Sequence, residues 1–241
     1  MENIKITFNP KQENLKEIED WMVEEKKIPI TENGNWESII YAFENKKLVI
    51  ATLKGKTVGF YTLSFYKYAI SIGVAEVNPN YRNKGIGKLL LDKIIEKYSA
   101  KDIYALHLFC APESSQKIWK KLKFKYYPNN SSNTRSRKIE MYRIIKPTLN
   151  CSNKIENEID EVIEIWNDEP YKTKNDQPTW IWKVKYLKNT NILKNPIVHF
   201  GLYEWRIRWR KGQTIYKDCK YKYFDSKNEE FSCVVIKETK K

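Results

Sequence analysis

The sequence predicts an α/β fold, a mixed sheet flanked by helices, followed by a smaller α+β domain built on an antiparallel sheet. In the first part of the chain, strand-like runs lie on either side of an amphipathic helix that a glycine turn opens, an order typical of mixed sheets. Beyond residue 150 the apolar period changes from 3.6 to 2, which indicates antiparallel strands. We therefore expect one domain over residues 1–147 and another over residues 151–241.

The first domain opens with a short strand and two helices. Ile4 to Phe8 is the strand, and Ile28 to Gly34 is a loop because proline and glycine interrupt both regular patterns. Apolar residues at helical spacing mark a helix on either side of this loop. They are Leu15, Ile18, Trp21 and Met22 in the first helix and Trp36, Ile39, Ile40 and Phe43 in the second.

Three strands come next, at residues 48–53, 57–65 and 69–77, and a hairpin turn at Gly55 joins the first two. Successive side chains of a strand point to opposite faces. In the third strand this alternation predicts two sets of residues, one on each face. Ile70, Ile72, Val74 and Glu76 form one set, and Ser71, Gly73, Ala75 and Val77 form the other.

The glycine turn then opens a helix that ends near Tyr98, and a strand, a helix and a last strand follow at residues 103–110, 113–122 and 137–145. The second domain is expected to begin with a helix, because five apolar residues recur at helical spacing. They are Ile155, Ile159, Val162, Ile163 and Trp166. Alternating strands then follow, and three runs of aromatic residues interleaved with lysine or arginine mark them.

Composition excludes several classes of protein. No apolar run approaches the roughly 18 residues of a membrane helix, and the start of the chain has no apolar block typical of a secretory signal, so we expect a cytoplasmic protein without membrane contact. The four cysteines lie far apart and only two histidines occur, which argues against a metal site or a disulfide framework. Serine hydrolase chemistry is disfavoured because no Gly-x-Ser-x-Gly motif is present.

The net charge of +14 admits two interpretations. Clustered cations bind phosphate backbones, so a nucleic acid is one expected partner. Lysine outnumbers arginine 37 to 7, however, and an AT-rich coding bias produces the same excess without selection for a polyanion.

The run from Arg82 to Lys88 follows a strand and opens a helix. Glycines let a backbone turn tightly, and the unpaired amides at a helix N-terminus point toward an anion. Val77-x-Pro79 followed by Tyr81-Arg82-x-x-Gly85-x-Gly87 resembles the acetyl-CoA signature of the GNAT superfamily of N-acetyltransferases. The order of elements over residues 1–145 resembles that family too. Neither the P-loop pattern nor the dinucleotide fingerprint is present.

The resemblance implies that the fourth and fifth strands splay apart, that pantetheine lies in this gap, and that the pyrophosphate meets the amides of the turn. Acetyl-CoA is then the expected acyl donor. The residues implied to contact it are Val77, Arg82, Lys84, Gly85, Ile86, Gly87, Lys88 and Ser115.

The chain departs from the family after the fifth strand. Relatives usually carry Asn-x-x-Ala-x-x-x-Tyr before Gly-Phe, and alignment on Phe124 puts Pro112, Ser115 and Trp119 at the three motif positions. The tyrosine hydroxyl protonates the leaving thiolate in many relatives, and an indole N–H cannot do so. A thiol with a pKa near ~8.5 leaves tolerably as an anion, so this acid is helpful rather than essential. Tyr126 and Tyr127 are alternatives for it.

Two residues are candidates for the general base. Glu76 shares the expected face of Ile70, Ile72 and Val74 at the end of the strand that would line the cleft, where burial would suit it to accept a proton. A structural ion pair is an equally good interpretation of this glutamate. His107, on the neighbouring strand, is the second candidate. Such a base matters because deprotonating a lysine amine at pH 7 costs about 4 to 5 kcal/mol.

These observations predict an acetyl-CoA-dependent N-acetyltransferase in which the amine attacks directly, with an acceptor that the second domain suggests is macromolecular. A small-amine acetyltransferase remains open. So does a degenerate CoA-binding module attached to a nucleic-acid-binding domain, which the missing tyrosine favours. Arg206, Arg208 and Arg210 are expected on one strand face, where guanidinium groups suit phosphate oxygens. Solvent-facing strand positions are normally charged as well.

Overall fold

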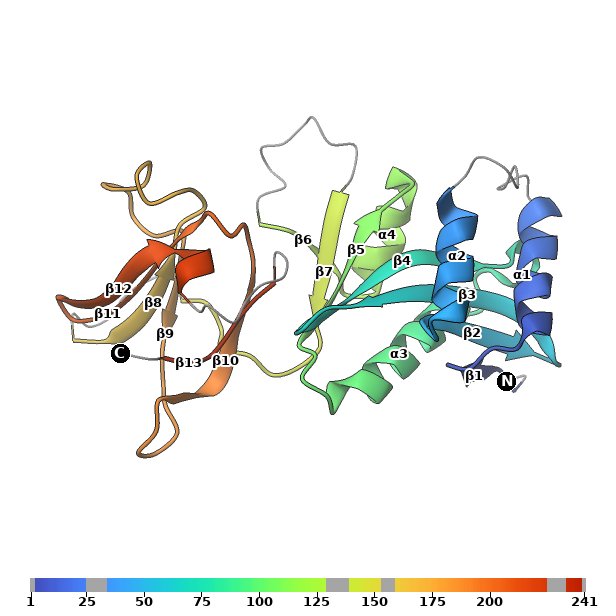
Figure 1. The fold of residues 1–241 in the computed structure, drawn as a ribbon, viewed down its shortest axis with the longest axis horizontal. Helices are drawn as coiled ribbons and strands as arrows, with labels where there is room; N and C mark the ends of the chain where they lie inside the picture. Colours follow the sequence, from blue (N-terminus) through green and yellow to red (C-terminus); the bar gives the residue numbers. More distant parts are fainter. Residues whose placement is uncertain (1–2, 25–33, 129–138, 153–158, 225–232, 240–241) are drawn as a thin grey trace. The chain divides into compact units, whose positions relative to one another are not determined.

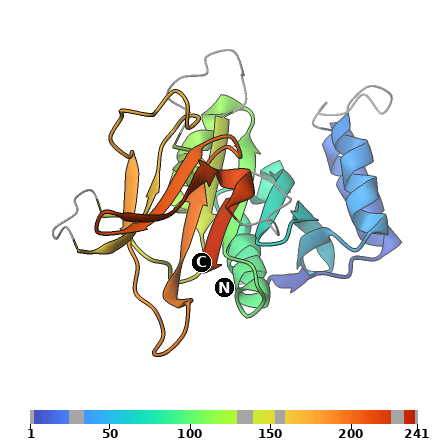
Figure 2. The ribbon, with the colours of Figure 1, turned by 60° about the vertical axis from the view of Figure 1, so that its left-hand side comes forward.

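The computed structural model describes residues 3–24, 34–128, 139–152, 159–224 and 233–239. The chain forms two compact units. One comprises Met1–Lys125 with Lys138–Ile145, and the other comprises Tyr126–Arg137 with Lys146–Lys241. Figures 1 and 2 show the mixed sheet of the first unit in blue through green to the yellow β7, and the strands of the second unit in gold to red.

A seven-stranded sheet with the order β1-β2-β3-β4-β5-β7-β6 forms the first unit. Strands β4 and β5 run parallel, and the other pairs whose register is described are antiparallel. The sheet is therefore mixed, as the sequence predicts. The strands are β1 Lys5–Thr7, β2 Leu48–Leu53, β3 Lys56–Phe65, β4 Ala69–Val77, β5 Ala105–Cys110, β6 Lys125–Tyr126 and β7 Ile139–Ile144.

Helices cover both faces of this sheet (Figure 1). On one face, α1 and α2 bury Ile18 and Ile39 against Phe60 of β3. On the other, α3 packs Leu90 and Ile94 into a larger core. The bounds are α1 Gln12–Glu24, α2 Gly34–Glu44, α3 Ile86–Ser99 and α4 Gln116–Lys121, with short 3-10 turns at Pro79–Tyr81 and Glu113–Ser115. Most of the expected loop between α1 and α2 lies outside the described residues.

A β-bulge in β4 corrects the predicted face of Glu76. Tyr61 pairs with Ala75 and Leu63 pairs with Ile72, so two residues of β4 lie opposite the single residue Thr62. The extra residue shifts the alternation by one position. Ile70 and Ile72 consequently face the α3 core, whereas Val74 packs on the α1/α2 side. Glu76 lies two residues after Val74 and therefore on the same face as Val74, not on the face of Ile70 and Ile72.

The second unit contains two antiparallel sheets, which confirms the predicted antiparallel strands of this region. Four strands have the order β12-β11-β8-β9, and β10 pairs with β13. Tryptophans and aliphatic residues, among them Trp205, Ile207 and Trp209, form its core. The strands are β8 Glu161–Ile165, β9 Trp180–Lys183, β10 Ile192–Phe200, β11 Arg206–Lys211, β12 Thr214–Lys220 and β13 Cys233–Glu238, with a 3-10 turn at Tyr221–Tyr223.

The helix predicted at the start of this unit is wrong for its described part. Residues 161–165 form β8, Ile159 is 79% exposed, and Ile155 lies outside the described residues. Val162 and Ile163 are both buried although they point to opposite faces. A strand buried on both faces has no period of two, so its apolar run resembles a helix pattern.

Candidate functional site

The glycine turn opens α3 as the sequence predicts. Gly85 is the N-cap with φ of 77°, and Asn83 has φ of 62°. The first hydrogen bond into the helix runs from the Leu89 amide to the Gly85 carbonyl at 3.0 Å. The amides of the three preceding residues lie at the open end of the helix, where backbone donors and the helix dipole favour an anion.

The two glycines of the turn are required for different reasons. A Cβ at Gly85 would meet no atom within 4 Å, so positive φ alone demands glycine there. A Cβ at Gly87 would lie 3.2 Å from the hydroxyl of Tyr61. Close packing against β3 is therefore the constraint at Gly87.

Strands β4 and β5 part beside this turn. Their parallel ladder runs from Ala69–Ala105 to Ile72–Leu108. In the described ladders, β4 beyond the bulge pairs with β3 from Ala75 to Val77 and no longer pairs with β5. The gap that the family resemblance implies thus begins at the bulge, and Val77 lies at its far end.

The turn carries three cationic side chains, and each of them contacts another residue. Arg82 donates through Nε to the Val77 carbonyl at 3.0 Å. The ammonium of Lys84 lies 5.1 Å from the ring centroid of Tyr81, and Lys88 pairs with Asp92 at 2.6 Å. Lys84 and Lys88 are exposed and Ile86 is buried. Ile86 can therefore offer its amide to a ligand while its side chain anchors the helix.

Glu76 is an ion-pair partner of the turn rather than a residue in an apolar site. Its side chain is 28% exposed, and a carboxylate oxygen lies 3.8 Å from a guanidinium nitrogen of Arg82. It sits opposite Phe60 in the β3 ladder. The structure therefore brings Glu76 to the turn, next to the parting of β4 and β5, on the face that α1 and α2 cover.

His107 lies in the middle of β5, opposite Ser71 on β4 and Tyr142 on β7. Its neighbours Leu106 and Leu108 face the α3 core, so the imidazole points to the other face. The ring is buried, its centroid lies 5.6 Å from that of Tyr66, and burial lowers the pKa of His107 to about 4. It is neutral at pH 7 and a much weaker base than an ordinary histidine.

The α4 region shows what replaces the family motif. Ser115 donates its hydroxyl to the Pro112 carbonyl at 2.8 Å, and its Oγ lies 3.1 Å from Sγ of Cys110. Trp119 is buried, with its ring 6.0 Å from Tyr61 and 5.1 Å from Phe124. Trp119 therefore fills the core.

The two tyrosines considered as substitute acids differ in exposure. Tyr127 is buried and packs on Phe200 at 4.9 Å. Tyr126 is 37% exposed, in the short strand β6.

The three arginines of β11 share a face, as predicted, but acidic partners occupy them. Arg206 makes a bidentate pair with Asp218 at 2.8 and 2.7 Å, and Arg208 donates to the same carboxylate at 2.9 Å. Arg210 donates twice to the buried Glu164 at 3.0 and 2.9 Å. These guanidinium groups are paired with carboxylates of the same sheet, and this pairing disfavours a phosphate-binding role.

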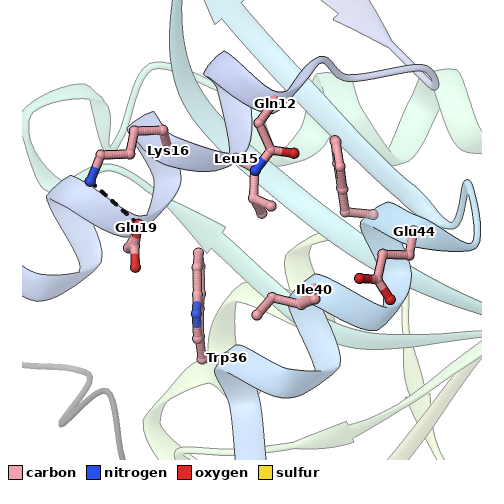
Figure 3. Close-up of a pocket in the computed structure, with 8 residues that line it drawn as sticks. Gln12, Leu15, Lys16, Glu19, Trp36, Ile40 and Glu44 are labelled. Carbon is pink, nitrogen blue, oxygen red and sulfur yellow. Dashed lines mark hydrogen bonds and ion pairs between the residues drawn. The ribbon is translucent and has the colours of Figure 1, made fainter.

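A shallow pocket lies elsewhere in the first unit, between α1 and α2 (Figure 3). It is lined by Gln12, Leu15, Lys16, Glu19, Trp36, Ile40, Phe43 and Glu44. None of the predicted site residues lines it. Its polar rim is partly self-paired, since Lys16 and Glu19 are 3.5 Å apart.

Two absences hold for the described parts of the chain. They contain no group of three or more histidine, cysteine or acidic side chains arranged to hold a metal ion. Within the same residues, the helices are too short or too polar to cross a bilayer.

Two residues at the site carry no recognisable sequence signal. Tyr61 and Thr62 contact the turn and the bulge respectively, and both resemble ordinary strand residues. Their position at the site depends on the pairing of β3 with the bulged β4, and no local sequence pattern predicts that bulge.

Comparison with known proteins gives one family. Residues 15–124 match the model of the acetyltransferase (GNAT) family. This region contains the bulge, the parting of β4 and β5, the glycine turn and α4. No curated protein matches the chain significantly.

Several solved structures are similar to the chain. A GNAT-family acetyltransferase from Staphylococcus aureus is 21% identical, covers 60% of this chain and 100% of its own, and has a TM-score of 0.48. The PaiA N-acetyltransferase of Thermoplasma acidophilum, in complex with coenzyme A, is 18% identical over 59% of this chain and 99% of its own, with a TM-score of 0.45. An aminoglycoside 6'-N-acetyltransferase complexed with coenzyme A is 14% identical over 61% and 99%, with a TM-score of 0.48.

Proposed function

Because residues 15–124 of this chain match the model of the acetyltransferase (GNAT) family, we propose that the protein transfers acetyl from acetyl-CoA to an amine by direct attack. The observation that carries the proposal is the combination of an open helix N-terminus at Gly85 with the parting of β4 and β5 beside it. This combination offers amide donors for a pyrophosphate and, beyond Ile72, an edge of β4 that no described residue of β5 pairs with, along which an extended pantetheine chain could lie.

The residues of the turn fit the chemistry of the donor. The amides of Ile86, Gly87 and Lys88 precede the first helical hydrogen bond, and Arg82 and Lys84 add positive charge that favours a pyrophosphate. The backbone of Val77 and the Ser115 hydroxyl complete the proposed contacts. When bound, acetyl-CoA supplies an acetyl thioester. The protein supplies orientation and a preorganised polar site, which are large terms in catalysis.

Glu76 is the proposed base, because its carboxylate lies beside the turn and close to the parting of β4 and β5, where the acetyl donor is proposed to bind. It would accept the proton that the acceptor ammonium loses before attack. We propose that a water molecule relays this proton, because the Glu76 carboxylate also forms an ion pair with Arg82. His107 is the second candidate, and its pKa of about 4 leaves it little driving force to take a proton from an amine.

Trp119 favours a second candidate function, a CoA-binding module without efficient transfer. Its buried indole occupies the position where many relatives carry the tyrosine that protonates the leaving thiolate. The second folded unit favours a macromolecular amine as the acceptor. The β11 arginines add no support for a nucleic-acid acceptor, because they are paired internally.

The proposal is tested by titrating CoA into the wild type and into Gly85→Val, and by measuring thiol release from acetyl-CoA with a panel of amines. We expect CoA binding by the wild type only, together with amine-dependent thiol release. Binding without release from any amine would favour the second candidate. No binding at all would contradict both.

A further inference from the structure

A buried tyrosine of β3 reaches the first turn of α3. The hydroxyl of Tyr61 donates to the carbonyl of Gly87 at 3.0 Å, and the residue is 3% exposed. Burial, and then the charge of Asp92, raises the pKa of this phenol. The hydroxyl therefore keeps its proton and remains a donor throughout the physiological pH range.

The contact is tight as well as polar. A Cβ at Gly87 would lie 3.2 Å from the Tyr61 hydroxyl oxygen and 3.9 Å from a methyl group of Val77. The glycine thus lets α3 approach β3 closely enough for the hydrogen bond to form. Tyr61 also pairs with Ala75 on the far side of the bulge, so one side chain links the bulged strand to the turn.

Trp119, which occupies the position of the family's tyrosine, packs against the Tyr61 ring. The Trp119 ring lies 6.0 Å from the Tyr61 ring with an interplanar angle of 52°, and Phe124 packs edge-on against Trp119 at 5.1 Å. Aromatic pairs at such separations stabilise one another. The chain of contacts runs from Phe124 through Trp119 and Tyr61 to Gly87.

We infer that Tyr61 is a positioning residue for acetyl-CoA, and that Trp119 serves this chain through its contact with Tyr61 rather than through proton transfer. The inference rests on the proposed function, because it assigns Tyr61 to the turn that would bind the pyrophosphate. Tyr61 fixes the carbonyl of Gly87, and with it the direction of the neighbouring amides. Loss of its hydroxyl should weaken CoA binding without touching the reacting atoms.

The first experiment compares Tyr61→Phe with Tyr98→Phe. Tyr98 is a matched control, since it is a buried tyrosine of the same core at the opposite end of α3. Loss of one hydrogen bond predicts that Tyr61→Phe raises the Kd of CoA and the KM of acetyl-CoA by about 3- to 10-fold, with kcat unchanged. Tyr98→Phe should leave all three at the wild-type level. Melting temperatures of the ligand-free variants check that both fold.

The second experiment uses the tight contact itself. Gly87→Ala in the wild type should weaken CoA binding, because the new methyl group would lie 3.2 Å from the hydroxyl oxygen, which must shift to make room. In the Tyr61→Phe background the hydroxyl is gone, and the same change should cost less. A non-additive cycle of this sign supports the inference.

The results separate two failures. If the wild type binds CoA and Tyr61→Phe binds it equally well, or if Tyr98→Phe weakens it as much, the role of Tyr61 is overturned and the proposed function stands. A wild type that binds no CoA overturns the proposed function and this role together.

Discussion

The side-chain hydroxyl of Thr62 accepts the backbone amide hydrogen of Val74 at 2.8 Å, at the point where β4 changes face. Thr62 lies opposite both residues of the bulge, and a Cβ at Gly73 would lie 2.8 Å from the same hydroxyl. One side chain therefore satisfies the amide that the bulge frees and leaves room only for glycine beside it. Glu76 owes its position on the α1/α2 face to this arrangement.

Removal of the Thr62 hydroxyl should disturb both stability and the site. Thr62→Val keeps the shape but loses the acceptor, so we expect the free energy of unfolding to fall by about 1–2 kcal/mol. The kcat/KM for acetyl-CoA should fall as well, because the end of β4 loses its anchor. Urea denaturation and steady-state kinetics measure the two effects. Thr52→Val on β2 is the control, and an equal loss in that variant would contradict a specific role for Thr62.

Gly85 offers a test of backbone conformation without crowding. Its φ is 77°, and no atom lies within 4 Å of the position that a Cβ would take, so only the dihedral angle opposes substitution. Asparagine tolerates positive φ far better than a β-branched residue does. We expect CoA to raise the melting temperature of Gly85→Asn and to have no effect on Gly85→Val. Equal shifts in both variants would remove the turn from the binding site.

The proposed base predicts a change in pH dependence. A general base gives the pH–rate profile an acidic limb, so Glu76→Gln should lower kcat and abolish this limb. His107→Asn should preserve the limb, because His107 is already neutral above pH 5, given its pKa of about 4. A profile that is unchanged in Glu76→Gln and altered in His107→Asn would exchange the two roles.

The β11 arginines predict a stability effect. Arg210→Gln would leave the Glu164 carboxylate, whose side chain is 3% exposed, with Arg208 at 3.9 Å as its remaining ion-pair partner among the described residues. Uncompensated buried charge is costly, so we expect a loss of about 3 kcal/mol. Lys211→Gln, an exposed change on the same strand, should cost less than about 0.5 kcal/mol. Similar losses of stability in both variants would contradict a structural role for Arg210. Weaker binding of Arg210→Gln to tRNA without any loss of stability would contradict it as well.

His199 predicts an acid-sensitive second unit. Burial lowers its pKa to about 3, its Nε2 has no hydrogen-bond partner among the described residues, and Trp180 lies 4.5 Å away. The unfolded chain binds a proton below about pH 6.5 and the folded unit does not, so stability falls as pH drops from about 6.5 toward 3, by up to about 1.4 kcal/mol per pH unit. His199→Phe should flatten this slope in urea titrations at pH 7 and pH 5. An unchanged slope would assign the effect to other groups.

The sequence predicts the turn well and the bulge poorly, for physical reasons. Gly85 and Gly87 are local requirements of a strand-to-helix turn, so a short motif locates them. The face of Glu76 depends on one extra residue near Gly73, and period-two reasoning assigns every later residue of the strand to the wrong side when a bulge intervenes. The pairing of Arg206 with Asp218 joins adjacent strands whose register no local pattern reveals.

The most direct test of the central claim is mass spectrometry of acetylated products after incubation with isotopically labelled acetyl-CoA and a lysate that contains proteins, RNA and small amines. We expect labelled acetyl groups on amines with the wild type, fewer with Glu76→Gln, and none with Gly85→Val. A wild type that binds CoA yet labels no amine in any fraction would contradict the assignment as an N-acetyltransferase.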